Sequence, residues 1–363
     1  MMTEESHNLN TDAIAGVFSN TSATYKYFWM LALLELNSDY DDEIPIQAMF
    51  AKMISLAWYP IHYFRLSFGK NDLLAQKVFS IHQHAPLTFP VKEKLSDLYS
   101  ALAASQDPFV LQELFHFESH VVFRFLTPWV GAEQSNAKMA SHSLQDELGA
   151  PYRIFRDKQT IEVRENWRVF FTRHKQVLRE FTYWELCLFL QKRNPNVPDI
   201  PNKLIKPITR NNLTKHKKVW DAVMPEFPVH LCMFTQTQIG PQSALDHFIP
   251  WSFVAHDQFW NLVPISQTAN SSKSDRIPDL GFYLKDLVSR QQIALRWLLG
   301  NQPSSSFLEE FQIAFDIAPG ELAEADLPVW EAVFRTQMDP MVQIATNMGF
   351  QNKWRYPHDL SIT

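Results

Sequence analysis

Hydrophobic residues recur at helical spacing over most of the chain, so the pattern predicts helices more often than strands. An apolar run without a polar face predicts a buried helix over 25–36. A second helix is expected over 46–58, where Pro60 should end it. A long helix is expected over 166–191, because apolar residues repeat there every three to four positions. Its buried side should consist of Trp167, Phe170, Phe171, Val177, Phe181, Trp184 and Leu188.

Three segments depart from this helical pattern. Residues 1–19 are polar and acidic and are expected to form a flexible leader. Apolar and charged residues alternate over 151–163, which predicts a two-stranded hairpin. Four prolines in 192–218 favour an extended linker. Beyond residue 280 the pattern returns to helix, over 282–299, 307–317 and 329–348 with a break at Pro340.

These elements predict a mainly α-helical, multi-domain protein, α+β overall. The length of 363 residues is sufficient for two or three domains. The predicted division is 1–19 as leader, 20–150 as an N-terminal helical domain, 151–225 as a hairpin, helix and basic linker, 226–280 as a small ββα finger, and 281–363 as a C-terminal helical region.

Composition narrows the class of protein further. Hydrophobic residues make up 46% of the chain and aromatic residues 13%, which indicates a packed core rather than disorder. The chain has nine glycines in 363 residues, far below the usual glycine content of roughly 7%, which argues against glycine-rich phosphate loops. Two cysteines are too few for a disulfide framework and fit a reducing compartment. With neither a signal peptide nor an apolar run long enough to span a bilayer, the sequence predicts a cytoplasmic protein without a membrane partner.

Charge is distributed unevenly along the chain. The formal net charge is -6, which by itself does not indicate a nucleic-acid partner. Residues 192–220, however, contain eight basic residues and one acidic residue. Basic side chains supply the sequence-independent part of nucleic-acid affinity, although a solvated linker would have the same composition. The candidate phosphate contacts in this stretch are Lys206, Arg210, Lys215, Lys217 and Lys218.

The stretch 245–278 follows this basic segment and has the order of a ββα unit. A short apolar segment carries Asp246 and His247, and a second one begins at Asn261. A polar stretch with helix-capping residues then carries Asn270. The sequence therefore predicts a strand, a loop, a second strand and a short helix.

The polar residues of this unit suit the hydrolysis of a phosphodiester. His247 can activate water, because an imidazole is substantially neutral at physiological pH. Asp246 should point to the opposite side of the strand, and its oxygens and that of Asn270 are ligands that Mg²⁺ prefers. Lys273 lies one turn after Asn270, where it could hold a phosphate or stabilise the transition state.

The stretch resembles the HNH, or His-Me finger, nuclease motif, and it is similar to the HNH domain of RNA-guided CRISPR nucleases. The shared features are a DH pair with a proline three residues later, an asparagine before the second strand, and an NxxKSD ending before a proline. The resemblance implies an embedded ββα-metal finger that acts as a DNA endonuclease. It implies His247 as general base, and Asn261 as the residue that braces the histidine-bearing loop. Asp246 and Asn270 would be the ligands of Mg²⁺, for which Mn²⁺ is a substitute, and Lys273 matches the end of the motif.

The motif departs from many HNH proteins in its cysteines. Those proteins hold the finger together with CxxC pairs and zinc, whereas Cys232 stands alone here. We therefore expect no structural zinc. The finger should instead be held by apolar packing of Phe248, Trp251, Phe253 and Trp260.

Several alternatives remain open on the sequence. Asp246 and His247 could be a polar pair at a strand end, or the finger could bind DNA without cutting it. A third alternative is a nuclease effector that a regulatory protein or signal activates. DNA is the expected partner and RNA the second choice, and a double-strand break would need a homodimer or two encounters. The resemblance also suggests antiviral defence or restriction in bacteria as the setting.

Overall fold

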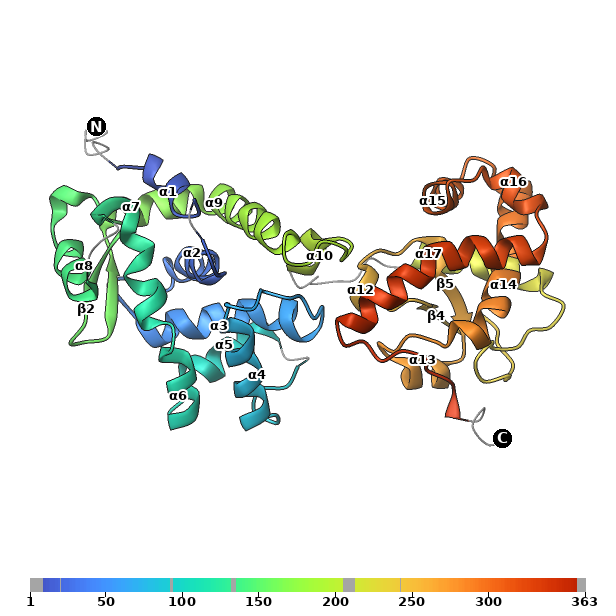
Figure 1. Cartoon of the computed structure of the whole chain (residues 1–363), viewed down its shortest axis with the longest axis horizontal. Coiled ribbons are helices and arrows are strands. Elements are labelled where there is room, and N and C mark those ends of the chain that lie inside the picture. Colours follow the sequence, from blue (N-terminus) through green and yellow to red (C-terminus); the bar gives the residue numbers. More distant parts are fainter. Residues whose placement is uncertain are drawn as a thin grey trace. The chain divides into compact units, whose positions relative to one another are not determined.

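The computed structural model describes residues 9–19, 21–91, 94–131, 135–204, 213–241 and 243–357. The chain divides into two compact units, residues 1–195 with 200–206, and residues 196–199 with 207–363 (Figure 1). Helices dominate both units, and each unit contains a small antiparallel sheet. The mainly α-helical, α+β fold class predicted from the sequence is confirmed.

The first unit consists of ten α-helices and a three-stranded sheet within the described residues. The sheet has the order β1-β3-β2, with β1 at Glu43–Pro45, β2 at Tyr152–Phe155 and β3 at Thr160–Val163. The helices are α1 Asp12–Gly16, α2 Tyr25–Leu36, α3 Ile46–His62, α4 Leu74–His84, α5 Leu95–Ala103, α6 Pro108–Phe115, α7 Thr127–Val130, α8 Asn136–Ser143, α9 Glu165–Gln191 and α10 Ile200–Leu204.

Helix α2 occupies the centre of this unit, as its apolar sequence predicts. Almost all of its side chains are buried, and it packs against α3 and α9. Helix α3 extends past the expected end and contains Pro60 in its last turn. A proline there removes a single backbone hydrogen bond, and the burial of Ile61 beyond it maintains the helix.

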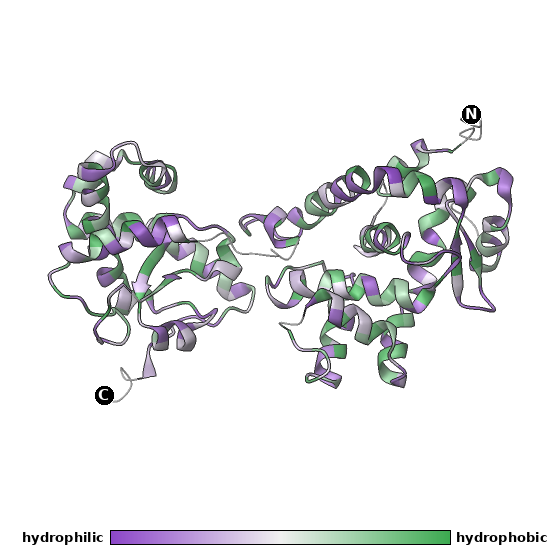
Figure 2. Cartoon of the chain, turned by 180° about the vertical axis from the view of Figure 1, so that it is seen from behind, coloured by the Kyte–Doolittle hydropathy of each residue, from purple (hydrophilic) through white to green (hydrophobic). Residues whose placement is uncertain are grey.

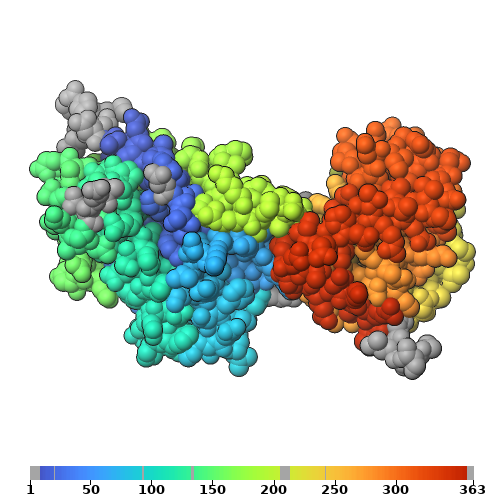
Figure 3. Space-filling model, viewed as in Figure 1, coloured from blue at the N-terminus to red at the C-terminus, as the bar shows by residue number. Residues whose placement is uncertain are grey.

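Two expectations about the first unit were wrong. Residues 9–19 are not a loose leader: α1 forms there, and Ile14, Val17 and Phe18 are buried. Residues 1–8 lie outside the described part of the chain. On α9, Val177 is 69% exposed, Trp184 61% and Leu188 43%, although all three were expected on the buried side. Helix α9 is drawn in yellow-green in Figure 3. Its apolar residues extend around more of the helix than the neighbouring helices cover, so some of them stay exposed.

The second unit surrounds a two-stranded sheet with helices. The strands are β4 Ala244–His247 and β5 Leu262–Ile265, joined through α12 Trp251–Val254 and the 3₁₀ turn η5 Phe259–Asn261. The remaining helices are α11 Thr214–Val223, α13 Gln267–Lys273, α14 Leu280–Asn301, α15 Ser306–Phe315, α16 Pro319–Glu324 and α17 Leu327–Asn347, the last running through Pro340 without a break.

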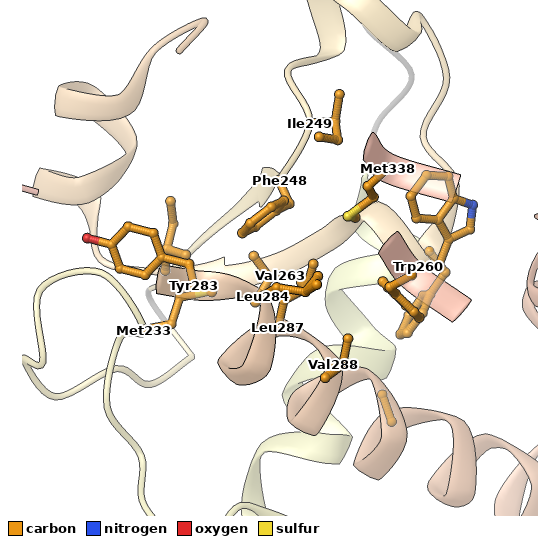
Figure 4. Packing of buried hydrophobic residues seen from close by; sticks show 14 of the residues in the cluster. Met233, Phe248, Ile249, Trp260, Val263, Tyr283, Leu284, Leu287, Val288 and Met338 are labelled. Atoms are coloured by element: carbon orange, nitrogen blue, oxygen red, sulfur yellow. The ribbon is translucent and has the colours of Figure 1, made fainter. Parts of the chain in front are cut away.

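One hydrophobic core holds the second unit together. Phe248 and Val263 from the sheet region lie beside Leu284 and Leu287 of α14, and Met338 of α17 joins them (Figure 4). The segments 226–280 and 281–363, expected as separate domains, therefore share their core. Among the aromatic residues expected to hold the finger, Phe248, Phe253 and Trp260 are fully buried, whereas Trp251 is half-buried.

Hydrophobic and hydrophilic residues are interleaved along the helices of both units (Figure 2). Accordingly, no helix in the described ranges is long and apolar enough to cross a membrane.

Candidate functional site

The candidate site is built on the pairing of β4 with β5. Asp246 lies opposite Val263 and His247 opposite Leu262 in the antiparallel register. Successive side chains of a strand point to opposite faces. Accordingly, the ring of His247 is buried whereas the carboxylate of Asp246 is partly exposed.

Helix α13 follows β5 directly and packs against β4. Ser266 precedes it, and its Oγ accepts a hydrogen bond from the backbone N–H of Ala269, which caps the helix at its beginning. The helix ends at Lys273, because Ser274 has a positive φ of 50°. Asn270 and Lys273 both belong to this short helix, and Lys273 contacts Asp246 on the strand.

Asn261 closes the loop between the two strands. Its side-chain Oδ1 accepts from the backbone N–H of Ile249 at 2.8 Å, and its Nδ2 donates to the carbonyl of Ile249 at 2.9 Å. Its own carbonyl accepts from the N–H of Phe248 at 2.7 Å. Because Asn261 is fully buried, these bonds are protected from water. They fix the backbone immediately after His247.

The imidazole of His247 is anchored by a carboxylate. Its Nε2 lies 2.9 Å from Oδ1 of Asp257, and the two side chains are 4% and 15% exposed. The sequence interpretation missed Asp257. The signal was present, however, because Asp257 is the single acidic residue among positions 248–260.

Lys273 lies deeper than the sequence led us to expect. Its ammonium is 2.9 Å from Oδ2 of Asp246 and donates to the carbonyl of His247 at 2.7 Å, and its side chain is 1% exposed. A phosphate in solvent has no access to a group buried in this way. The structure therefore makes Lys273 a partner of Asp246 rather than a phosphate contact.

Comparison with known families identifies this arrangement. Residues 232–279 match the family model described as HNH endonuclease. The chain contains an HNH endonuclease domain. No curated protein and no solved structure matches the chain.

The HNH match includes β4, β5 and α13, and it ends at the residue before α14 begins. It gives the protein a nuclease domain that acts on nucleic acid. HNH nucleases generally depend on a divalent metal ion.

The oxygen donors of the HNH domain fit such an ion. Asp246 has one oxygen paired with Lys273, and its other oxygen has no hydrogen bond within the described part of the chain. The amide of Asn270 is half-buried and also lacks a hydrogen-bond partner among the described residues. Carboxylate and amide oxygens are hard donors of the kind that Mg²⁺ prefers. Within those same residues there is no cluster of three or more His, Cys, Asp or Glu that could hold a metal.

The basic residues expected to bind nucleic acid are placed unequally. Lys206 and Arg210 lie outside the described residues. Lys215 and Lys218 are exposed on α11, which belongs to the same unit as the HNH domain. Lys217 is half-buried, and its ammonium donates to the carbonyl of Ser243 at 2.9 Å.

Proposed function

We propose that the protein is a metal-dependent DNA endonuclease in which His247 is the general base. The observation that carries this proposal is the packing of α13 against β4. Asn270 belongs to this helix, whose Lys273 contacts Asp246 and the carbonyl of His247, and all of these residues lie within the segment that matches the HNH family. A base and two hard oxygen donors thus share one small scaffold.

In the proposed reaction His247 accepts a proton from a water molecule. The water oxygen forms a bond to phosphorus while the bond from phosphorus to the 3′ oxygen breaks, and the departing 3′ oxygen takes a proton from solvent, which leaves a 5′-phosphate and a 3′-hydroxyl. Asp246 and Asn270 would hold Mg²⁺, or Mn²⁺ as a substitute, which supplies positive charge to neutralise the phosphate and the departing oxygen. Asn261 keeps His247 in place through its bonds to Ile249.

The substrate of the proposed reaction is DNA. Lys215 and Lys218 present ammonium groups to solvent on α11, in the same compact unit as the HNH domain. Such groups bind phosphates irrespective of sequence. One HNH domain cuts one strand, so a nick is the expected product of a single encounter.

A plasmid assay tests this function. Supercoiled DNA is incubated with the full chain and Mg²⁺ or Mn²⁺, beside reactions that contain EDTA. We expect nicking that EDTA abolishes and that disappears in Asp246→Ala, His247→Ala and Asn270→Ala. Asp286→Asn, which changes an exposed carboxylate on α14, is the matched control and should nick normally.

The opposite results are equally clear. If the protein binds DNA but does not nick it with either Mg²⁺ or Mn²⁺, the HNH domain binds DNA without cutting it. Faster cleavage of labelled RNA than of DNA would show that RNA is the preferred substrate. Full nicking by His247→Ala would refute the assignment of the base.

A further inference from the structure

The contact between His247 and Asp257 involves one particular ring nitrogen. An ionised carboxylate only accepts hydrogen bonds, so the 2.9 Å contact requires a proton on Nε2 of His247. Nδ1 of His247 has no hydrogen-bond partner within the described part of the chain. In a neutral imidazole with its proton on Nε2, Nδ1 is the nitrogen able to accept a proton.

The backbone around Asp257 is fixed from outside the HNH match. On its C-terminal side, the N–H of Phe259 donates to Oε2 of Glu310 in α15 at 2.5 Å. Gln291 of α14 donates to the carbonyl of Phe259 at 3.3 Å and to that of Leu262 at 2.7 Å. Gln291 is fully buried. Two helices that lie beyond residue 279 therefore hold the loop that bears Asp257.

A third side chain lies beside the same loop. The ring of His216 from α11 packs on Phe259 and Phe307, with ring centroids 6.4 and 4.7 Å apart. Burial lowers the pKa of His216, and the charge of Asp257 opposes that change. The charge of Asp257 likewise raises the pKa of Glu310, so His216 and Glu310 both lie near this carboxylate, and the imidazole of His247 contacts it at 2.9 Å.

We propose that Asp257 is a positioning residue that orients His247 and fixes its tautomer, so that Nδ1 is the nitrogen that receives the proton of the attacking water. This inference rests on the proposed role of His247 as base. Asp257 itself takes no proton; its charge stabilises the imidazolium that forms when Nδ1 is protonated. The proton on Nε2 stays in the hydrogen bond to Asp257 throughout the step.

The proposal differs from a purely structural role of Asp257. A carboxylate that only supported the loop would affect folding and DNA binding, and Asn would replace it nearly as well. A positioning carboxylate affects the chemical step, because an Asn amide can also donate to the imidazole and favour the wrong tautomer. Asp257→Asn preserves the shape of the side chain and separates the two roles.

Single-turnover cleavage of labelled DNA by the full chain is the first test. Relative to wild type, we expect Asp257→Asn to cleave on the order of 100-fold more slowly at saturating enzyme. Its DNA affinity, measured by fluorescence anisotropy in EDTA, and its melting temperature should match those of wild type. Asp257→Glu should recover part of the rate, and Asp286→Asn should behave as wild type.

Two failures can be told apart in this assay. If His247→Ala abolishes cleavage while Asp257→Asn cleaves at the wild-type rate, the role of Asp257 is refuted and that of His247 stands. If His247→Ala cleaves normally, the proposed base is refuted together with its positioning residue.

A second measurement does not depend on activity. In ¹⁵N-histidine-labelled protein at pH 8, the resonances of His247 are identified by their absence from His247→Ala. Wild type should show one neutral tautomer with the proton on Nε2, and Asp257→Ala should show a mixture of both. A wild-type proton on Nδ1, or an unchanged tautomer in Asp257→Ala, would overturn the proposal.

Discussion

Replacing Lys273 by Met tests whether the buried ion pair holds the HNH domain together. Met has a similar length and fills the same space, so the change removes the charge without leaving a large cavity. The variant can form neither the 2.9 Å ion pair with Asp246 nor the 2.7 Å hydrogen bond to the carbonyl of His247. The expected effect is a decrease in both stability and cleavage.

The size of the decrease in stability follows from these two interactions. A hydrogen bond to a charged group contributes about 1.5–3 kcal/mol and a neutral one about 1 kcal/mol. Removing one partner of a fully buried pair costs about 3–5 kcal/mol. The side chain of Asp246 is 17% exposed, so water can partly solvate the carboxylate that remains. We therefore expect Lys273→Met to lower the free energy of unfolding by about 2–4 kcal/mol.

Urea unfolding followed by tryptophan fluorescence measures this change, since Trp220, Trp260 and Trp330 are buried in the same core. Lys285→Met, which removes an exposed lysine on α14, is the control and should change the unfolding free energy by less than about 0.5 kcal/mol.

A double-mutant cycle with Asp246→Asn isolates the pair itself. The two changes should couple by about 1–3 kcal/mol, because Lys273 contributes much less once its partner is neutral. Strict additivity, or a Lys273→Met variant as stable as wild type, would refute the reasoning.

Three further changes address other parts of the unit. Asn261→Ala leaves a buried N–H and a buried carbonyl without partners, so urea unfolding should show a decrease in stability of about 2–5 kcal/mol, and the variant should not nick DNA. Burial raises the pKa of Glu310 to about 6 from its ordinary value of 4.5, and the N–H of Phe259 partly opposes this. The folded state therefore binds that proton more tightly, and stability is lost as pH rises through 4.5 to 6; the melting temperature of Glu310→Gln minus that of wild type should grow over this range. Charge reversal at Lys215 and Lys218 should weaken DNA binding and reduce the slope of log affinity against log salt by about 0.9 for each phosphate that the protein no longer neutralises.

Each of these measurements has a contrary result. A stable Asn261→Ala variant would mean that water replaces the hydrogen bonds of the amide. A melting difference for Glu310→Gln that does not change with pH would show that its carboxyl has an ordinary pKa when folded. If the slope of log affinity against log salt does not change, DNA does not contact Lys215 and Lys218 on α11.

Local patterns were sufficient where an element satisfies its own backbone hydrogen bonds and its apolar residues lie close together in sequence. Helix α2 and the hairpin of β2 and β3 are of this kind, and so is the order of β4, β5 and α13. The choice of His247 likewise rests on a contiguous motif, which the family match covers.

Other features depend on which distant segments meet. Strand β1 is three residues long and pairs with β3, which lies more than a hundred residues away. A pattern in so short a segment predicts no partner. Similarly, the apolar residues of α9 suggested burial at Trp184, but burial depends on where neighbouring helices pack.

The sequence by itself determined the helical class of this protein, the ββα order of its HNH domain, and the residues Asp246, His247, Asn261 and Asn270 that the proposed chemistry uses. Tertiary structure alone decided that Lys273 turns inward to Asp246 and that Asp257 holds the ring of His247. The physical reason is that residue types determine what chemistry is available, whereas charge pairing and burial depend on how the chain packs. Here α14 and α15, outside the recognised motif, fix the loop on which Asp257 stands.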